Sequence, residues 1–559
     1  MKTKWNNIMQ YVSVLLCLAS ITLLGTFLNN ETVAGESGGS VPNAASNASY
    51  TLPKPVAQNE TVVELNIGET QKVKLSDGSS VNLKLISIKE RKDSVIGAIR
   101  LVDVMVEING HPLALTSGDY SLPVEVKGRP RITRRGGLIP PDGGQKAGSI
   151  PGVKIDCPST YGYVTTSMPY PNGLINYWGM KKAARFRLWP KDAPLTVPGT
   201  FVYPVKQKFL ASASQMCNEP VFVGGSEAPG TTSFYYHYGL DFAGSEGDVD
   251  IVAMADGLIV SAADHTLSEF DKEPIVTHID GIWLLDGRGW YYRYSHLNKI
   301  FVKPGQSVKA GQVIAKLGKE GPAGYSGGWS HLHLGILTDQ CTGLWGDLQA
   351  YPCVFEASWN EYKPKLLAVA RPHHTGIVGE KFVLSGANSK AASGKIVSYE
   401  WMCSNGKKLS GKEVEIVYDK PGAWSEILKV TDSQGNVAYD AVLSVIFTPE
   451  MVKNPPKRAI ASVPRIHLAY YPTFDIKPGT EITFKVRSSW TDGWNETLDF
   501  GDGSPIAHLK SDGNRDRTNP TGYAIVKHKY AKPGTYIVHA QHANSIGVKA
   551  NMHVFVTVE

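Results

Sequence analysis

Turn-forming residues divide this chain into many short apolar runs, and this feature constrains its fold most strongly. The 559 residues include 56 Gly and 34 Pro. Val, Thr and Tyr are scattered through the short runs between them, a pattern typical of strands joined by turns rather than of long helices. We therefore predict a mainly β fold. At about 150 residues per domain, the length predicts three or four domains rather than a single core.

The N-terminus resembles a secretory signal. Lys2 and Lys4 precede an uncharged apolar run from Tyr11 to Leu28, and a polar stretch follows it. Cleavage is expected after Ala34, which makes residues 1–34 a signal peptide. Because about 18 apolar residues can span a bilayer, an uncleaved membrane anchor is the alternative. Both interpretations predict an exported protein that is periplasmic, in the cell envelope or secreted, and membrane contact is expected only if the segment is uncleaved.

An exported protein can hold disulfides, so the cysteines matter. Five of them follow the N-terminal segment, and an odd number leaves at least one unpaired within the chain. We expect Cys341 to pair with Cys353 and Cys157 to pair with Cys217. Cys403 is then expected to be buried and free.

Charge argues against a nucleic-acid partner. The net charge of +6 is spread along the chain rather than gathered into a basic stripe with interleaved aromatic residues. One basic group lies in a Gly/Pro-rich stretch and comprises Lys127, Arg129, Arg131, Arg134 and Arg135. This group could contact an anionic polymer such as a cell-wall glycan, but a solvated linker is the favoured interpretation.

Composition shifts predict the domain boundaries. Residues 35–60 are rich in Ser, Asn, Ala, Gly and Pro and form a linker. Residues 61–128 show alternating runs broken by Asp-Gly and Asn-Gly dipeptides, which are strong hairpin signals, so we expect a small β domain. Residues 129–152 form a second, Gly/Pro-rich linker. Residues 153–362 form a denser, aromatic-rich domain with its core at 201–350.

The C-terminal part contains a repeat. The segment 418–424, Tyr-Asp-Lys-Pro-Gly-Ala-Trp, returns as Tyr-Ala-Lys-Pro-Gly-Thr-Tyr at 530–536. A repeat of this kind predicts two copies of one design, here residues 365–449 and 456–559. The second copy also carries Phe500-Gly501-Asp502-Gly503, and it resembles the polycystic-kidney-disease (PKD) type of immunoglobulin-like module. The first copy lacks the Asp-Gly turn and is PKD-like. The resemblance implies β-sandwiches that act as spacers or bind proteins or glycans.

Candidate metal ligands occur in three short segments. His237 stands four residues before Asp241, and Gly239 lets the backbone bend between them. His296 lies in an aromatic strand-like run. His331 and His333 alternate with leucines, so on a strand both imidazoles face one side. Two imidazole nitrogens and a carboxylate oxygen, with a fourth position left for water, are the ligand set of a catalytic zinc ion. Each segment alone is weak evidence; together they are specific.

In this order the segments, together with Ala255-Asp256-Gly257 and the run 308–314, resemble the lysostaphin/LytM-type metallopeptidase domain. The resemblance covers about residues 201–350 and implies a compact antiparallel β sheet that lines a groove. It implies that His237, Asp241 and His333 bind one Zn²⁺ per chain. It further implies that His296 and His331 are catalytic, one as the general base and the other stabilising the oxyanion.

One segment departs from the family pattern. The chain between Ala263 and His296 is long and contains extra acidic and aromatic residues, which we expect to reshape the groove. His265 and His278 in this segment are expected to be exposed loop residues rather than ligands.

The sequence therefore predicts an exported zinc metallo-endopeptidase whose substrate is peptidoglycan cross-links or another peptide. Two alternatives stay open. The domain could be a catalytically silent scaffold that regulates other wall enzymes, although no ligand is lost here. The protein could also be chiefly an adhesin that attaches through its PKD-like modules and N-terminal β domain, with or without catalysis.

Overall fold

The computed structural model describes most of the chain after residue 49. The described residues are 50–118, 120–126, 131–132, 138–139, 152–164, 177–222, 229, 234–319, 329–455, 463–489, 491, 495–514, 519 and 522–559. They belong to one compact unit, residues 41–559. The predicted signal peptide or anchor at 1–34 lies outside them. Among the described residues, no helix is long and apolar enough to cross a membrane.

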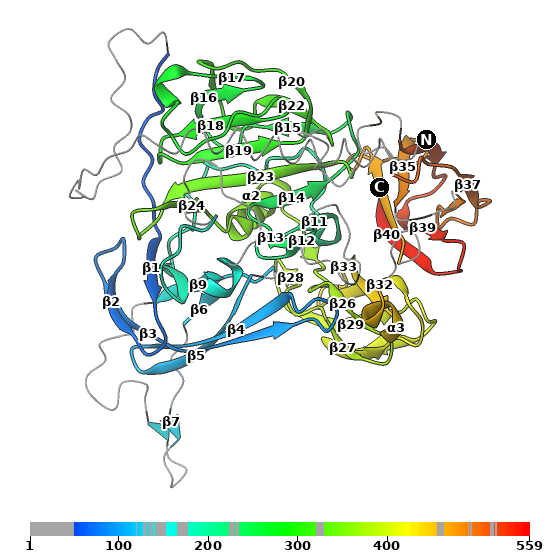
Figure 1. Ribbon diagram of the computed structural model, residues 1–559, viewed down its shortest axis with the longest axis horizontal. Coiled ribbons are helices and arrows are strands. Elements are labelled where there is room, and N and C mark those ends of the chain that lie inside the picture. The colour runs from blue at the N-terminus through cyan, green and yellow to red at the C-terminus, as the bar shows by residue number, and fades with distance from the viewer. Residues whose placement is uncertain are drawn as a thin grey trace, which may run out of the picture. The chain divides into compact units, whose positions relative to one another are not determined.

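Strands dominate the structure, so the predicted mainly β, multidomain fold is confirmed (Figure 1). The N-terminal sheet has the order β1-β10-β9-β5-β4-β3-β2, with β6 on β9. Its strands are β1 Thr61–Leu65, β2 Thr70–Lys74, β3 Ser80–Lys92, β4 Ile99–Ile108, β5 His111–Ser117, β6 Val124–Glu125, β9 Val153–Thr160 and β10 Ala184–Pro190. A separate pair consists of β7 Arg131–Ile132 and β8 Leu138–Ile139.

The N-terminal sheet takes strands from both sides of residues 129–152, which we expected to separate two domains. β9 and β10 belong to the predicted range 153–362, yet β10 pairs along its length with β1 and β9. Apolar side chains from both segments share one core, for example Leu65, Val104, Ile155 and Phe186. The sheet is therefore built across this predicted boundary.

The central sheet holds the candidate site and is antiparallel throughout. Its order is β11-β14-β23-β19-β18-β16-β17, with β21 on β16 and β24 on β23. Its strands are β11 Ser214–Gln215, β14 Leu240–Ala243, β16 Gly257–Ala262, β17 His265–Thr266, β18 Ile282–Asp286, β19 Tyr291–Ser295, β21 Ser307–Val308, β23 His331–Asp339 and β24 Trp345–Asp347. The chain between Ala263 and His296, here called the inserted segment, supplies β17 and β18 and so extends this sheet.

Smaller elements complete the central domain. A three-stranded sheet consists of β15 Asp250–Val252, β22 Val313–Leu317 and β20 Leu297–Ile300, and a hairpin consists of β12 Pro220–Phe222 and β13 Phe234–Tyr236. Helix α2 spans Tyr351–Tyr362 and begins with a proline in its first turn. Its buried side chains Tyr351, Val354 and Phe355 join the central core, which continues through both sheets.

Two β-sandwich modules follow. Module 1 comprises β25 Leu366–Leu367, β26 His374–Ile377, β27 Lys381–Ser385, β28 Lys390–Ala391, β29 Ile396–Met402, β30 Lys408–Ser410, β31 Glu413–Val417, β32 Gly422–Asp432 and β33 Val437–Phe447. After the short helix α3 Pro449–Lys453, module 2 comprises β34 Arg465–Tyr471, β35 Glu481–Ser489, β36 Glu496–Asp499, β37 Ala507–Leu509, β38 Ala524–Lys529, β39 Gly534–Ala543 and β40 Lys549–Val558.

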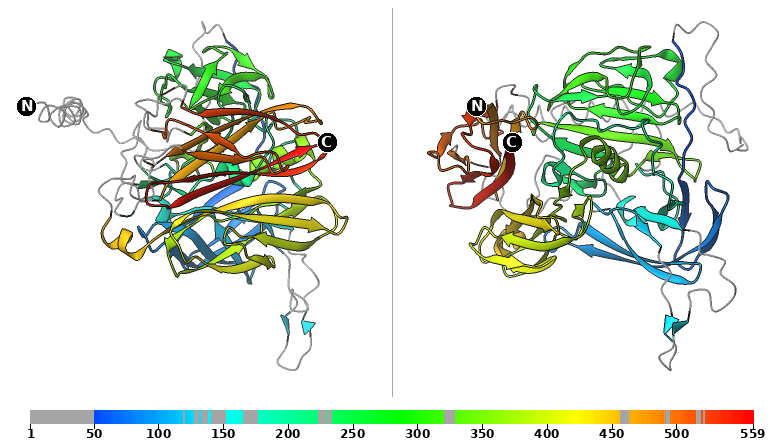
Figure 2. Two further views of the ribbon diagram at one scale, coloured as in Figure 1. Left: turned by 90° about the vertical axis from the view of Figure 1, so that its right-hand side faces the viewer. Right: turned by 180° about the vertical axis from the view of Figure 1, so that it is seen from behind.

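The two modules share a sheet. β32 of module 1 pairs in parallel with β40 of module 2 through Gly422 opposite Lys549 and Ala423 opposite Ala550. The yellow strands of module 1 and the red strands of module 2 lie side by side in Figure 2. Gly422 leaves no room for a side chain, because a Cβ there would lie 3.0 Å from the Lys549 carbonyl oxygen. The two modules therefore pack against each other as a pair rather than as separate domains.

The predicted disulfides are wrong. Cys157, Cys217, Cys341, Cys353 and Cys403 are all free. Cys341 is exposed, whereas Cys353 is buried in α2, and the Cys217 thiol donates to the Gly239 carbonyl oxygen at 3.0 Å. Four of these cysteines are buried and pack as small apolar residues. Cys403 is one of them, as expected.

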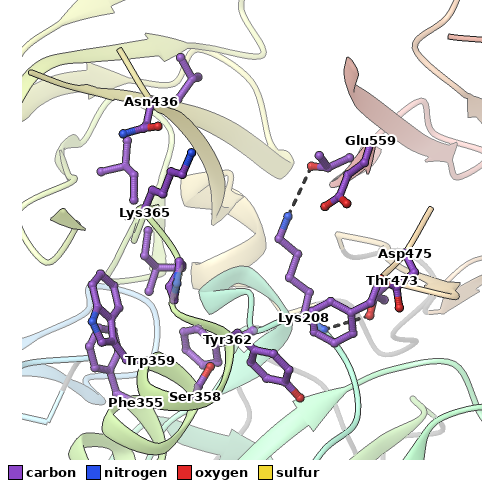
Figure 3. A pocket seen from close by; sticks show the side chains of 17 residues that line it. Lys208, Phe355, Ser358, Trp359, Tyr362, Lys365, Asn436, Thr473, Asp475 and Glu559 are labelled. Carbon is purple, nitrogen blue, oxygen red and sulfur yellow. Dashed lines mark hydrogen bonds between the residues drawn. The ribbon is translucent and has the colours of Figure 1, made fainter. Parts of the chain in front are cut away.

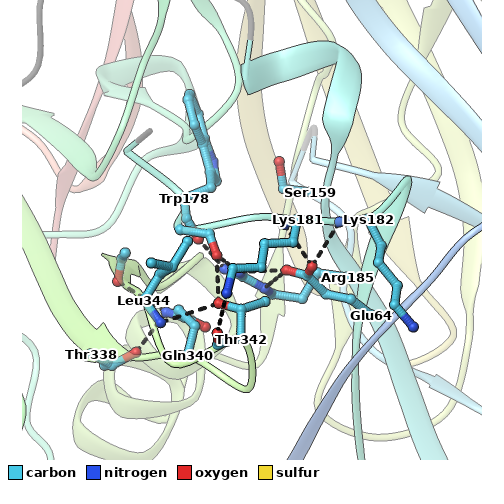
Figure 4. A network of polar contacts seen from close by, with 12 residues as sticks. Glu64, Ser159, Trp178, Lys181, Lys182, Arg185, Thr338, Gln340, Thr342 and Leu344 are labelled. Atoms are coloured by element: carbon cyan, nitrogen blue, oxygen red, sulfur yellow. Dashed lines mark hydrogen bonds and ion pairs between the residues drawn. The ribbon is translucent and has the colours of Figure 1, made fainter. Parts of the chain in front are cut away.

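A buried polar network connects the N-terminal sheet to the turn that follows β23 (Figure 4). The Arg185 guanidinium donates to the Glu64 carboxylate at 2.7 Å and to the Trp178 carbonyl oxygen at 2.5 Å. Thr342 donates to the Gly179 carbonyl oxygen at 2.8 Å. Because Arg185 and Glu64 are only 4% and 3% exposed, losing either partner would leave an uncompensated buried charge.

A cavity of about 470 Å³ lies between α2 and both C-terminal modules (Figure 3). Trp359 and Tyr362 of α2 face it, with Lys208 and Thr473 across from them. None of the five predicted site residues lines this cavity. It is therefore separate from the candidate site.

Candidate metal centre

Strand pairing brings two of the predicted ligands together. β14 lies antiparallel to β23 with Asp241 directly opposite His333 and Ala243 opposite His331 (Figure 1). On the other side of β23, Ser295 of β19 also stands opposite His333. Because side chains alternate along a strand, His331 and His333 face one side while Leu332 and Leu334 enter the core. The alternation predicted from the sequence is present.

The third predicted ligand depends on a glycine. His237 directly follows β13, and the chain turns at Gly239, whose φ is +90°, before Asp241 in β14. A Cβ at Gly239 would lie 2.5 Å from the Leu334 carbonyl oxygen and 3.1 Å from His333 Nε2. Only glycine allows this close approach and this conformation together. The turn brings His237 back toward Asp241.

Three donor atoms converge on one point. His237 Nε2 lies 3.1 Å from His333 Nδ1 and 3.2 Å from Asp241 Oδ1, and His333 Nδ1 lies 2.9 Å from Asp241 Oδ1. Two atoms bound to a tetrahedral zinc ion lie about 3.4 Å apart. The triangle therefore fits a zinc ion after shifts of a few tenths of an ångström. Among the described residues, His237, Asp241 and His333 form the group that could hold a metal ion.

Backbone carbonyls fix the orientation of the histidines. His237 Nδ1 lies 3.1 Å from the Met216 carbonyl oxygen, and His331 Nδ1 lies 2.9 Å from the Trp329 carbonyl oxygen. Since a carbonyl oxygen only accepts, Nδ1 of each ring carries the proton and Nε2 presents a lone pair. Both rings are thus pre-set as ligand or base through Nε2.

The two predicted catalytic histidines lie beside the ligand triangle. His331 Nε2 is 3.6 Å from Asp241 Oδ2, and the ring of His296 lies 4.7 Å from that of His331 and 6.1 Å from that of His333. His296 has a φ of +66°, a conformation that costs a non-glycine residue of order 1–2 kcal/mol. The structure therefore brings all five predicted residues together.

Asp280 holds His296 in that strained conformation and was not among the predicted site residues. Its carboxylate accepts from the His296 backbone N–H at 2.9 Å and lies 3.3 Å from His296 Nδ1. Asp280 stands sixteen positions earlier in the chain. Only the acidic character of the inserted segment pointed toward it.

Burial and mutual charge set the protonation of the group. Burial lowers the pKa of His333 to about 3 and also lowers the pKa of His331. Burial opposes ionisation of Asp241, but the neighbouring His237 and His331 hold its pKa well below its usual range. For His237, burial is outweighed by Asp241, which raises the pKa. Neutral His333 and ionised Asp241 are the forms that bind a metal, and His237 would release its proton when a metal binds.

The other two histidines of the inserted segment do not enter the cluster. His265 is exposed as expected. His278 is half-buried rather than exposed, and burial lowers its pKa to about 4. His278 interacts electrostatically with Arg293, Asp280 and His296, so it borders the site.

Residues 235–342 match peptidase family M23, and residues 366–446 and 468–558 match PKD domains. The chain carries an M23 peptidase domain followed by two PKD domains. The M23 match contains all five residues of the site, and modules 1 and 2 are the PKD domains. The M23 domain is a peptidase domain, so both resemblances inferred from the sequence are confirmed.

Solved structures similar to parts of the chain include M23 and PKD domains. The catalytic domain of lysostaphin, an antimicrobial peptidase from Staphylococcus simulans, is 26% identical, with 25% of this chain and 91% of that chain covered and a TM-score of 0.19. LytM from Ruminococcus gnavus is 20% identical over 29% of this chain and 61% of that chain, with a TM-score of 0.19. A PKD domain of the Vibrio cholerae metalloprotease PrtV is 24% identical over 15% of this chain and 99% of that chain, with a TM-score of 0.13.

Proposed function

We propose that this protein is an exported zinc metallo-endopeptidase that hydrolyses peptide bonds, with peptidoglycan cross-links as its substrate. One observation supports the proposal above all others. Two histidine nitrogens and a carboxylate oxygen, brought together from His237, Asp241 and His333, form a triangle with sides of 2.9 to 3.2 Å inside an M23 domain. This donor set suits zinc and leaves a coordination position open.

His237, Asp241 and His333 would hold the ion. When bound, zinc supplies a Lewis acid that polarises a peptide carbonyl and makes water nucleophilic near neutral pH. We assign the general base to His331, whose Nε2 is left as an acceptor because Nδ1 donates to the Trp329 carbonyl oxygen at 2.9 Å. This nitrogen takes the proton of the attacking water and passes it to the leaving amine.

We assign the stabilisation of the tetrahedral oxyanion to His296. Its Nδ1 lies 3.3 Å from the Asp280 carboxylate, so we assign Nε2, when it carries a proton, as the donor to the oxyanion. Asp280 also fixes the backbone N–H of His296, which keeps the ring at its place beside His331. Preorganised donors of this kind need no rearrangement when charge develops on the substrate.

The substrate is inferred from chemistry and family. The resemblance to lysostaphin/LytM-type domains and the predicted export favour a wall peptide over a cytoplasmic one. The PKD modules add a proposed second role in binding glycan or protein, which would keep the peptidase on an insoluble polymer. No nucleic acid is expected as a partner.

The test combines metal content with hydrolysis. Purified full-length protein should contain about one zinc per chain by mass spectrometry, as the ligand triangle of His237, Asp241 and His333 implies. It should release new amino termini from purified peptidoglycan, and a chelator should abolish this release. His333→Ala should remove both zinc and hydrolysis. A correctly folded wild-type protein with neither zinc nor peptide release would instead favour the silent scaffold.

A further inference from the structure

PKD module 2 contacts the two segments of the M23 domain that adjoin the metal centre. In the loop after β14, the Lys485 ammonium lies 2.8 Å from Asp248 Oδ2 and donates to the Glu246 carbonyl oxygen at 2.5 Å. In the segment before β23, the Ser330 backbone N–H donates to the Tyr523 hydroxyl at 2.8 Å. Asp241 lies in β14 and His331 begins β23, so this module meets both strands of the site.

Ser330 ties these two M23 segments to each other. Its hydroxyl donates to the Gly244 carbonyl oxygen at 2.5 Å, and its own carbonyl oxygen accepts from the Gly244 N–H at 3.2 Å. Ser330 is fully buried. A shift of this residue would therefore disturb both β14 and β23.

The Tyr523 hydroxyl is itself held in place within module 2. A backbone N–H can only donate, so the hydroxyl accepts from Ser330 and its own proton is free for another partner. His467 Nδ1 lies 3.0 Å from this oxygen and accepts the hydroxyl proton. Burial keeps the His467 ring neutral by lowering its pKa to about 3, and the ring packs 5.1 Å from that of Trp329.

One peptide unit connects Tyr523 to His331. The carbonyl of Trp329 and the N–H of Ser330 belong to the same planar group. Tyr523 holds the N–H end at 2.8 Å, and His331 Nδ1 donates to the carbonyl end at 2.9 Å. Because the group is rigid, rotation at one end moves the other. Fixing the N–H therefore fixes the acceptor that orients the His331 ring.

We propose that Tyr523 of PKD module 2 is a positioning residue for His331, so that module 2 completes the active site of the M23 domain. This inference rests on the proposed function and deepens it. Tyr523 does not touch substrate; it acts through the Trp329–Ser330 peptide. The second PKD module is then a part of the catalytic unit as well as a spacer or binder.

The test uses the full-length chain and Tyr523→Phe, which keeps the ring and removes the hydroxyl. Losing one buried hydrogen bond that orients a catalytic group should lower kcat about tenfold, with KM changed less than about twofold. Rates are divided by the zinc bound per chain, so that loss of metal or of folded protein is not counted as lost positioning. Tyr530→Phe is the matched control, because the Tyr530 hydroxyl donates to the Phe500 carbonyl oxygen at 2.9 Å within module 2.

The expected result is a lower kcat per zinc in Tyr523→Phe and an unchanged value in Tyr530→Phe. An unchanged kcat per zinc in Tyr523→Phe, or an equal loss in the control, would overturn the inference while the proposed peptidase stands. A wild-type chain without chelator-sensitive hydrolysis would overturn the proposed function, and this inference with it. If Tyr523→Phe does not fold, His467→Leu takes its place and should lower kcat about threefold, because the hydroxyl loses its acceptor.

Discussion

The two histidines of β23 lie two residues apart on one face of a strand, yet they are held in different ways. His333 is enclosed by its own domain. The ring of Tyr238 packs edge-on at 5.4 Å, and the backbone at Gly239 lies so close to the imidazole that a Cβ there would be 3.1 Å from Nε2. His331 depends on a distant part of the chain, since the peptide that accepts its Nδ1 proton is held by Tyr523 of module 2. The proposed ligand is therefore secured locally and the proposed base at long range.

This difference separates two properties that a metallopeptidase needs. Metal affinity should depend on the M23 domain and the segments packed behind it rather than on module 2, because the three donor atoms are positioned by β13, β14 and β23. The rate of the chemical step should also depend on module 2. Changes near each histidine can test whether binding and rate divide in this way.

The largest effect is expected from the histidines themselves. His333→Ala should lose zinc and, with it, at least about 10³-fold in hydrolysis, because a Lewis acid is removed. His331→Ala should keep its zinc and lose about 10²–10⁴-fold in kcat, the usual contribution of a general base. Zinc content and kcat are measured on both variants. Equal zinc loss in both would mean that His331 is a ligand, and the comparison would then fail.

Gly239→Ala should weaken the local enclosure of His333. The new Cβ would lie 2.5 Å from a backbone oxygen in a left-handed conformation, so we expect a loss of about 2–4 kcal/mol in stability and a lower zinc affinity. Gly289→Ala is the control, since Gly289 has a φ of +79° but no atom near its Cβ position. Thermal unfolding and zinc titration compare the two. Equal effects would show that backbone conformation alone is responsible.

Local patterns made part of this site predictable. The alternation around His331 and His333 and the glycine between His237 and Asp241 each follow from the geometry of a strand or a turn. Tyr523 could not be predicted, because it lies 193 residues from Ser330 and belongs to no motif. The same holds for β10, whose pairing with β1 on one edge and β9 on the other is set by a shared core rather than by turn residues.

The disulfide prediction failed for a related reason. The number of cysteines says nothing about the distances between them. Cys353 lies on the buried face of α2, whereas Cys341 is exposed. The repeat at 418–424 and 530–536 correctly indicated two similar modules. It did not indicate that β32 and β40 join them in one sheet, because the two pairs that join them, Gly422 with Lys549 and Ala423 with Ala550, use backbone groups that every non-proline residue carries.

The support behind His333 should make stability depend on pH. Asp347 donates its backbone N–H to the Tyr177 carbonyl oxygen at 2.6 Å, and Tyr177 stacks on Tyr238 at 3.8 Å. Burial raises the pKa of Asp347 to about 7, although Arg293 opposes the shift. The folded protein thus keeps a proton that the unfolded chain releases near pH 4, so stability should fall as pH rises from about 4 to about 7.

Asp347→Asn removes this titration. Its unfolding midpoint should change less between pH 5 and pH 8 than that of the wild type, by an amount equivalent to about 1–4 kcal/mol. Asp264→Asn is the control, because the Asp264 side chain is 67% exposed. Scanning calorimetry at several pH values measures both. A wild-type pH dependence that survives in Asp347→Asn would assign it to another group.

The smallest effect is expected at the outer contact of module 2. Lys485→Met keeps the length of the side chain but removes the charge that meets Asp248 and the Glu246 carbonyl. Because Lys485 is 12% exposed and Asp248 37%, the pair is partly screened, and its loss should cost about 1 kcal/mol. The loop after β14 should loosen, so kcat per zinc should fall about twofold to threefold, less than for Tyr523→Phe.

Lys527→Met is the matched control, since Lys527 pairs with Glu481 and the two side chains are 62% and 44% exposed. If Lys485→Met lowers zinc content rather than kcat, module 2 also supports the ligands, and the division between local and long-range support of the two histidines no longer holds.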